Sequence, residues 1–173
     1  MRVFACVALL AFSLAVGVID FRTRRIPNWL NVSGALAPLV LAGVAGGAHL
    51  LSAAAGLGVA VAIGFLLFAL RTLGAGDAKF MAAIGAWAGI QRLPTAFLAM
   101  LAGGAVVALL YSWRYRMLKA TLTSSATMLG SMASGGAPTS PWVGHTAVGR
   151  FPYGVGLGLG AAVWWLWAGC RLV

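Results

Sequence analysis

Acidic residues are almost missing from this chain. Only two of its 173 residues are acidic, Asp20 and Asp77, against 12 lysines and arginines, and only 8% of the residues are charged. Soluble domains average roughly 25% charged residues, so the composition excludes an ordinary soluble protein. Because 62% of the residues are hydrophobic, the chain is predicted to lie in a lipid bilayer.

Metal-ligating residues are also scarce. The chain has two cysteines, Cys6 and Cys170, and two histidines, His49 and His145. They show no C-x-x-C or H-x-x-x-H spacing, so no metal site and no cofactor is expected. Both cysteines lie in or beside apolar segments, where a thiol usually behaves as a small hydrophobe. A disulfide between them is the alternative if both face an oxidising periplasm.

Long apolar runs make up most of the remaining sequence. They are Val3–Ile19, Trp29–Ala48, Leu50–Leu70, Ala78–Ile90, Pro94–Trp113 and Tyr153–Cys170. A helix crosses about 30 Å of hydrocarbon with about 20 apolar residues. The sequence therefore predicts an all-α polytopic membrane bundle of about six transmembrane helices, forming a single domain over residues 1–173. Asp20 and a basic run follow the first segment in place of a cleavage site, which predicts a retained span.

Small residues recur at helical spacing within these runs. Gly56, Ala60 and Gly64 share one face of the third run, and Gly156 and Gly160 share a face of the sixth. Such faces let helix backbones approach closely in lipid. The glycines are therefore predicted to serve mainly in packing.

The basic residues lie in the short breaks between apolar runs. With the N-terminus in the periplasm, nine of them fall on the cytoplasmic side: Arg22, Arg24, Arg25, Arg71, Lys79, Arg114, Arg116, Lys119 and Arg150. Only Arg2, Arg92 and Arg171 then lie outside. This distribution follows the positive-inside rule and predicts a multi-pass inner-membrane protein. It also argues against a nucleic-acid partner, because no basic patch is gathered on one surface.

One sizeable polar region, from Tyr115 to Arg150, interrupts the apolar pattern. Its first half places Leu118, Leu122 and Leu129 on one helical face, which predicts an amphipathic helix along the inner membrane surface. Its second half, residues 133–149, is typical of a loop because it is rich in glycine, serine and proline. We expect a cytoplasmic segment at about 115–150, with a role in substrate access.

The two acids are placed where they can act together. Asp20 ends the first span and Asp77 begins the fourth, so both are expected at the cytoplasmic level of the membrane. If these helices are neighbours, the carboxyls can hold a water, one deprotonating it while the other polarises a peptide carbonyl. Two carboxyls in one site should share a proton and titrate as a unit. Gly74 and Gly76 allow a sharp turn and close approach of a substrate strand.

Other roles for the two acids remain open at the level of sequence. Asp20 could form a helix-end salt bridge with Arg24, and Asp77 could pair with Lys79 or Arg71. The chain could also be a small membrane transporter or assembly subunit in which the acids relay protons or bind a cation. A transporter more often shows internal repeats or helices broken at the bilayer midplane, whereas both acids here lie at span ends.

Three motifs, spread in order over most of the chain, resemble the type IV prepilin peptidases. They are the segment Asp20–Asn28, the Gly-Ala-Gly-Asp-Ala-Lys segment of residues 74–79, and Phe-Pro-Tyr-Gly at residues 151–154. Gly-x-Gly-Asp alone is shared with presenilin-like intramembrane proteases, but the combination is specific.

The resemblance implies cleavage of the leader peptide of prepilins or prepilin-like proteins at the cytoplasmic face. Asp20 and Asp77 match the catalytic pair of the family. The resemblance also assigns site-shaping or substrate-binding positions to Gly74, Gly76, Lys79, Arg25, Pro27, Asn28, Pro152, Tyr153 and Gly154. For Lys79, tuning of the acid pair and anchoring of the helix to headgroups are equally open.

A peptidase-only form is implied by what the longer family members carry in addition. They have a cytoplasmic region with paired cysteines and N-methylate the trimmed pilin. This chain is similar to the short forms of tight-adherence (Flp) pilus systems, so its expected partners are a prepilin substrate, the bilayer and possible pilus assembly proteins.

Overall fold

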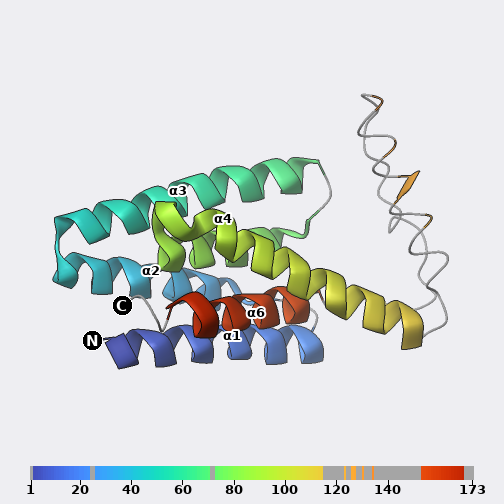
Figure 1. Ribbon diagram of the computed structural model, residues 1–173, viewed down its shortest axis with the longest axis horizontal. Coiled ribbons are helices and arrows are strands. Elements are labelled where there is room, and N and C mark those ends of the chain that lie inside the picture. Colours follow the sequence, from blue (N-terminus) through green and yellow to red (C-terminus); the bar gives the residue numbers. More distant parts are fainter. Residues whose placement is uncertain are drawn as a thin grey trace.

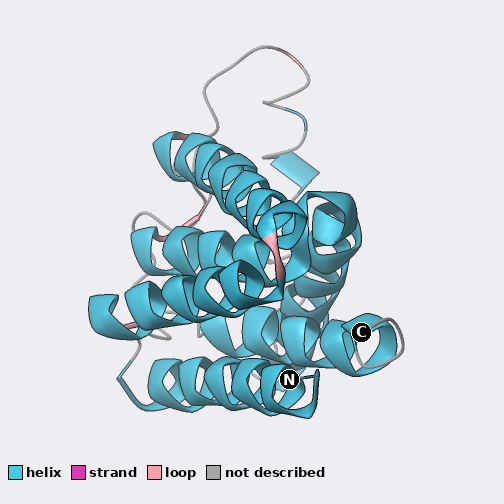
Figure 2. Cartoon of the chain, turned by 90° about the vertical axis from the view of Figure 1, so that its left-hand side faces the viewer, coloured by secondary structure: helices cyan, strands magenta, loops and turns pink. Residues whose placement is uncertain are grey.

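The structure is a bundle of membrane-length helices. The computed structural model describes residues 2–23, 26–70, 73–114 and 153–169, together with residues 123, 126–127, 130 and 134. Its elements are α1 (Arg2–Thr23), α2 (Asn28–Ala45), α3 (Gly47–Ala69), α4 (Ala75–Arg114), α6 (Tyr153–Trp164) and a π-helical turn, η2 (Trp165–Gly169) (Figures 1 and 2). Four helices, α1 to α4, are long and apolar enough to cross a membrane, and Gly154–Trp167 is a shorter apolar stretch. The predicted helical membrane bundle is confirmed.

Helix α4 contains both the fourth and the fifth predicted span. It runs for 40 residues, but the backbone of Gly89 is not helical, with φ 66° and ψ 169°. A positive φ suits glycine, which has no Cβ to clash. The predicted boundary at residues 91–93 was therefore wrong, because the direction changes at one residue without a polar loop.

The chain reverses direction at this break. Gly64 of α3 packs against Ala78, and Ser52 donates a hydrogen bond of 2.6 Å to Gln91, so α3 and the first half of α4 are antiparallel. The second half returns beside α6, with Thr95 next to Trp164 and Gly104 next to Leu157. Figure 1 shows α4 turning back in this way beside α3. The helices thus alternate in direction as the six predicted spans require.

Close helix packing depends on the predicted small residues. A Cβ at Gly56 would lie 2.8 Å from the backbone carbon of Gly89, and one at Gly160 would lie 2.7 Å from the Cα of Met100. Real Cβ atoms do not approach backbone so closely, so these contacts require glycine. The predicted role of the glycines in packing is confirmed at these positions.

Helix α2 has a proline within it, and α4 compensates for the missing hydrogen bond. Pro38 has no N–H, so the carbonyl of Gly34, four residues earlier, lacks its usual helical donor. Trp87 of α4 donates its indole N–H to that carbonyl at 2.9 Å. The ring of Phe12 packs directly on Gly34 from α1, so three helices meet at this residue.

Large side chains fill the centre of the bundle. Its fully buried members include Leu9 and Val16 of α1, Phe80 and Ile84 of α4, and Met100 beyond the break. The rings of Phe12 and Phe80 lie 5.5 Å apart between their centroids. These residues fix α1 relative to α4 and so determine where the two acids lie.

Candidate active site

Asp20 lies in the last turns of α1 and faces α6. Only 6% of its surface is exposed. A Cβ on Gly154 would lie 2.8 Å from the carboxyl carbon of Asp20, so the start of α6 lies directly against this carboxyl. Residue 154 must be small for α1 and α6 to meet here, which gives a physical reason for glycine at that position.

Asp77 lies in the first turn of α4 and is half-buried. The N–H of Ala78 donates to the carbonyl of Gly74 at 3.0 Å, which extends the helical turn back to the residue before α4. A Cβ on Gly74 would lie 3.0 Å from Oδ2 of Asp77. The helix N-terminus favours a negative charge there, because its first N–H groups have no intrahelical partners.

The fold brings these two acids together from distant parts of the sequence. The charge of Asp20 acts on Asp77, so their carboxyls lie within electrostatic range of each other. Among the described residues, the backbone of α1 packs against α6 and α2 and makes little direct contact with α4. The two helices are neighbours through side chains such as Phe12 and Phe80, which keeps their backbones apart.

The N-terminal part of α2 holds the first turn of α4 on both sides of Asp77. Lys79 donates its ammonium to Oδ1 of Asn28 at 2.7 Å. Asn31 donates its Nδ2 to the carbonyl of Gly76 at 3.3 Å. A Cβ on Gly76 would be 3.5 Å from the Cβ of Ile26, so the turn before α2 also packs here.

Asn31 was not identified from the sequence. It lies within an apolar run, one helical turn after Asn28, and a polar amide in such a run could have drawn attention to it. Pro27, by contrast, was expected to shape the start of the second helix. It adopts φ −62° and ψ 140°, an extended conformation immediately before α2.

Several predicted positions cannot be placed. Arg25 and Pro152 lie outside the described residues, as do the side chain of Tyr153, residue Cys170 and most of residues 115–150. The alternative of a Cys6–Cys170 disulfide therefore stays open, and the amphipathic surface helix stays a prediction. So do the salt bridges with Arg24 and Arg71, which also lie outside that part of the chain.

Comparison with known proteins identifies a family for this chain. Residues 7–109, which include both acids, match the type IV leader peptidase family. The prepilin leader peptidases/N-methyltransferases of Burkholderia pseudomallei strains 1026b and K96243 are each 35% identical over 127 residues, covering 65% of this chain and 39% of the relative. The chain thus spans about two fifths of the length of these curated relatives. No solved structure matches it. On the extent of the family match, the chain belongs to the type IV leader peptidase family.

Proposed function

We propose that this chain is a membrane aspartic endopeptidase that cleaves the leader peptide from prepilins or prepilin-like proteins. The observation that carries the proposal is the placement of Asp20 and Asp77 at the same end of the bundle, near the end of α1 and in the first turn of α4. They are the only acids in the sequence, and they interact electrostatically although 57 positions separate them in the chain (77 − 20). Family membership supports the same activity.

The two carboxyls divide the chemistry between them. Two like charges at short range cannot both be kept cheaply, so the pair holds one proton between them. The ionised carboxyl takes a proton from a water, whose oxygen attacks the scissile carbonyl carbon. The protonated carboxyl donates a hydrogen bond to the carbonyl oxygen and stabilises the charge that develops there. Collapse of the tetrahedral intermediate breaks the C–N bond, and the leaving amine receives a proton from the pair.

Glycine positions lie beside both acids. Gly74, Gly76 and Gly154 all lie beside one of the two acids or next to it in sequence, and none presents a side chain toward the carboxyls. An extended peptide can approach closely only where side chains are small. The proposal covers the peptidase step alone, with no cofactor and no metal in the mechanism.

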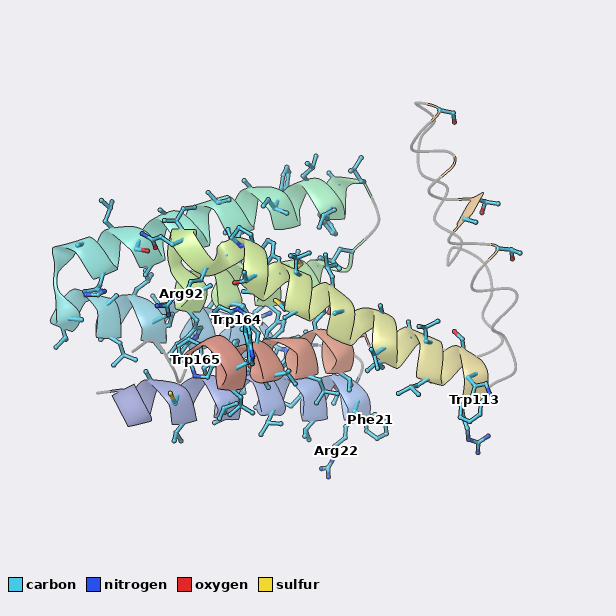
Figure 3. The ribbon with its side chains drawn as sticks, viewed as in Figure 1. Phe21, Arg22, Arg92, Trp113, Trp164 and Trp165 are labelled. Atoms are coloured by element: carbon cyan, nitrogen blue, oxygen red, sulfur yellow. The ribbon has the colours of Figure 1, made fainter. Side chains whose placement is uncertain are left out.

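We propose that this site faces the cytoplasm at the inner membrane, with the N-terminus in the periplasm. Arg22 and Arg114 lie at the end of the bundle where α1 and α4 finish, whereas Arg92 lies near the opposite end. Figure 3 places Arg22 and Trp113 at one end, and Arg92 with Trp164 and Trp165 toward the other. The positive-inside rule puts the end richer in basic residues inside. A prepilin is the expected substrate, and pilus assembly proteins are possible partners.

Purified protein in detergent or liposomes, incubated with candidate prepilins, tests the proposal. We expect one cut just before the hydrophobic segment of the prepilin, identified from the new N-terminus by mass spectrometry. Activity should persist in EDTA. A mock preparation from cells lacking the chain controls for other peptidases. Failure of well-folded protein to shorten any of several prepilins would contradict the proposed function, and loss of activity in EDTA would contradict its mechanism.

A further inference from the structure

The Asn31 side chain is buried beside the candidate site with only one end bonded. It is 4% exposed, and its Nδ2 donates to the carbonyl of Gly76 at 3.3 Å. Its Oδ1 is buried and has no hydrogen-bond partner within the described part of the chain. If the amide were flipped, Oδ1 would face the carbonyl oxygen of Gly76, and two acceptors cannot form a hydrogen bond. The orientation with Nδ2 toward Gly76 is therefore the favoured one.

The position of this acceptor is set by its bonded neighbour. Nδ2 and Oδ1 are attached to the same carbon, so Oδ1 also lies close to the peptide group that joins Gly76 to Asp77. That peptide group leads directly into one of the two acids. On the other side of Asp77, Lys79 is hydrogen-bonded to Asn28. Helix α2 therefore places a buried acceptor next to the turn that carries Asp77, and it also holds that turn.

We propose that Asn31 binds the main chain of the peptide to be cleaved. Its Nδ2 positions Asp77 through the carbonyl of Gly76, and its Oδ1, which is buried in the free protein, accepts a hydrogen bond from a backbone N–H near the scissile bond when α2 and α4 part enough to admit the peptide. This inference rests on the proposed peptidase function. Burial without a partner is unfavourable for an amide oxygen, and a substrate N–H removes that penalty on binding.

Backbone recognition is the form of binding that this environment allows. A peptide held for attack by water presents its N–H groups whatever its side chains are. An amide acceptor reads such a donor independently of sequence, whereas a carboxylate in the same place would add charge to Asp20 and Asp77. Asn31 thus supplies binding without disturbing the acid pair.

A matched pair of variants separates this role from simple packing of α2 on α4. Asn31→Leu has nearly the same shape but loses both hydrogen bonds. Trp87→Phe is the control, because it removes another side-chain bond from α4 to α2, the one of 2.9 Å to the carbonyl of Gly34. We expect kcat/KM for prepilin cleavage to fall about ten- to a hundredfold in Asn31→Leu. Trp87→Phe should stay within about threefold of the unchanged protein once folded protein is measured.

A loss of less than about threefold in Asn31→Leu relative to Trp87→Phe would overturn the inference. The proposed function is judged separately in the same assay, because it fails only if the unchanged protein does not cleave.

A second variant covers the case in which Asn31→Leu does not fold. Asn31→Asp reproduces both bonds when protonated, with O–H as donor and C=O as acceptor, and loses the donor when ionised. At low pH its activity should be close to that of the unchanged protein. The ratio of the two activities should fall as pH rises and the new carboxyl ionises. The charged and titratable groups nearby are Asp20, Asp77 and Lys79, which both proteins share. A relative activity that does not change with pH would contradict the assigned role.

Discussion

The two ends of the bundle are made of different residues. At the end that carries Asp20 and Asp77, Gly154 of α6 packs against Asp20, Asn28 accepts a hydrogen bond from Lys79, and Asn31 donates one to the carbonyl of Gly76. At the opposite end, Trp165 lies 5.7 Å from Trp164 and 6.1 Å from Trp87 between ring centroids. Trp164 donates its indole N–H to Thr95 at 3.1 Å.

We expect this difference to separate the part that holds the fold from the part that carries the proposed chemistry. Large rings have many packing contacts, and in lipid such packing is a main source of helix association. Small residues contribute fewer packing contacts, and glycines lie beside both acids. The aromatic end should therefore govern stability, and the end that carries the two acids should govern activity.

Gly154→Ala should have the largest effect on activity among the packing variants. Its Cβ would lie 2.8 Å from both Cγ and Oδ2 of Asp20, so the carboxyl has to move. Misplacement of a reacting group by about 1 Å costs about a hundredfold in rate, which is the loss we expect in prepilin cleavage. Gly58→Ala is the control, because a Cβ there has nothing within 4 Å. Equal activity of the two variants would contradict close packing of α6 on Asp20.

Trp165→Ala should act in the opposite way, on stability and not on catalysis. Trp165 is 4% exposed, and removing a buried ring costs roughly 3–5 kcal/mol. We expect a clear fall in the midpoint of thermal unfolding in detergent, while folded protein keeps its kcat/KM. Trp167→Ala, at a position 66% exposed, should change neither quantity. A loss of activity in folded Trp165→Ala would show that the two ends are not separate.

Lys79→Met should have the smallest effect, about threefold on cleavage, because Lys79 is exposed and its bond to Asn28 is partly solvated. If that bond holds α4 against α2, Asn28→Leu should have the same effect, and the double variant should be no worse. If Lys79 instead tunes the acid pair, only Lys79→Met should shift the pH profile of cleavage. The bond to Asn28 favours the first outcome.

Much of the fold could be predicted from the sequence because apolar length and small-residue spacing are local properties. The apolar runs predicted where the helices lie. The small-residue faces through Gly56 and Gly160 make close packing contacts in the structure. The reversal at Gly89 was missed because one glycine with positive φ looks like any other glycine in a chain that has 24.

The site was harder to predict than the fold. The scarcity of acids singled out Asp20 and Asp77, but their approach depends on how α1, α2 and α6 pack around α4. That packing is tertiary and leaves no local signal. Asn31 was missed for the same reason, because only the neighbouring Gly76 carbonyl gives its amide a role. The expected functions of all the site-shaping positions, among them Arg25, Pro152 and Tyr153, stay predictions.

The most direct test of the acid pair compares Asp20→Asn, Asp77→Asn and the double variant in one cleavage assay, with insertion and folding checked for each. An amide can neither take a proton from water nor share one with its partner. Each single variant should therefore lose about a thousandfold or more in prepilin cleavage. The double variant should be no worse than either single one, because both acids act on one water. Substantial cleavage by well-folded Asp77→Asn, or losses that add up in the double variant, would contradict the account.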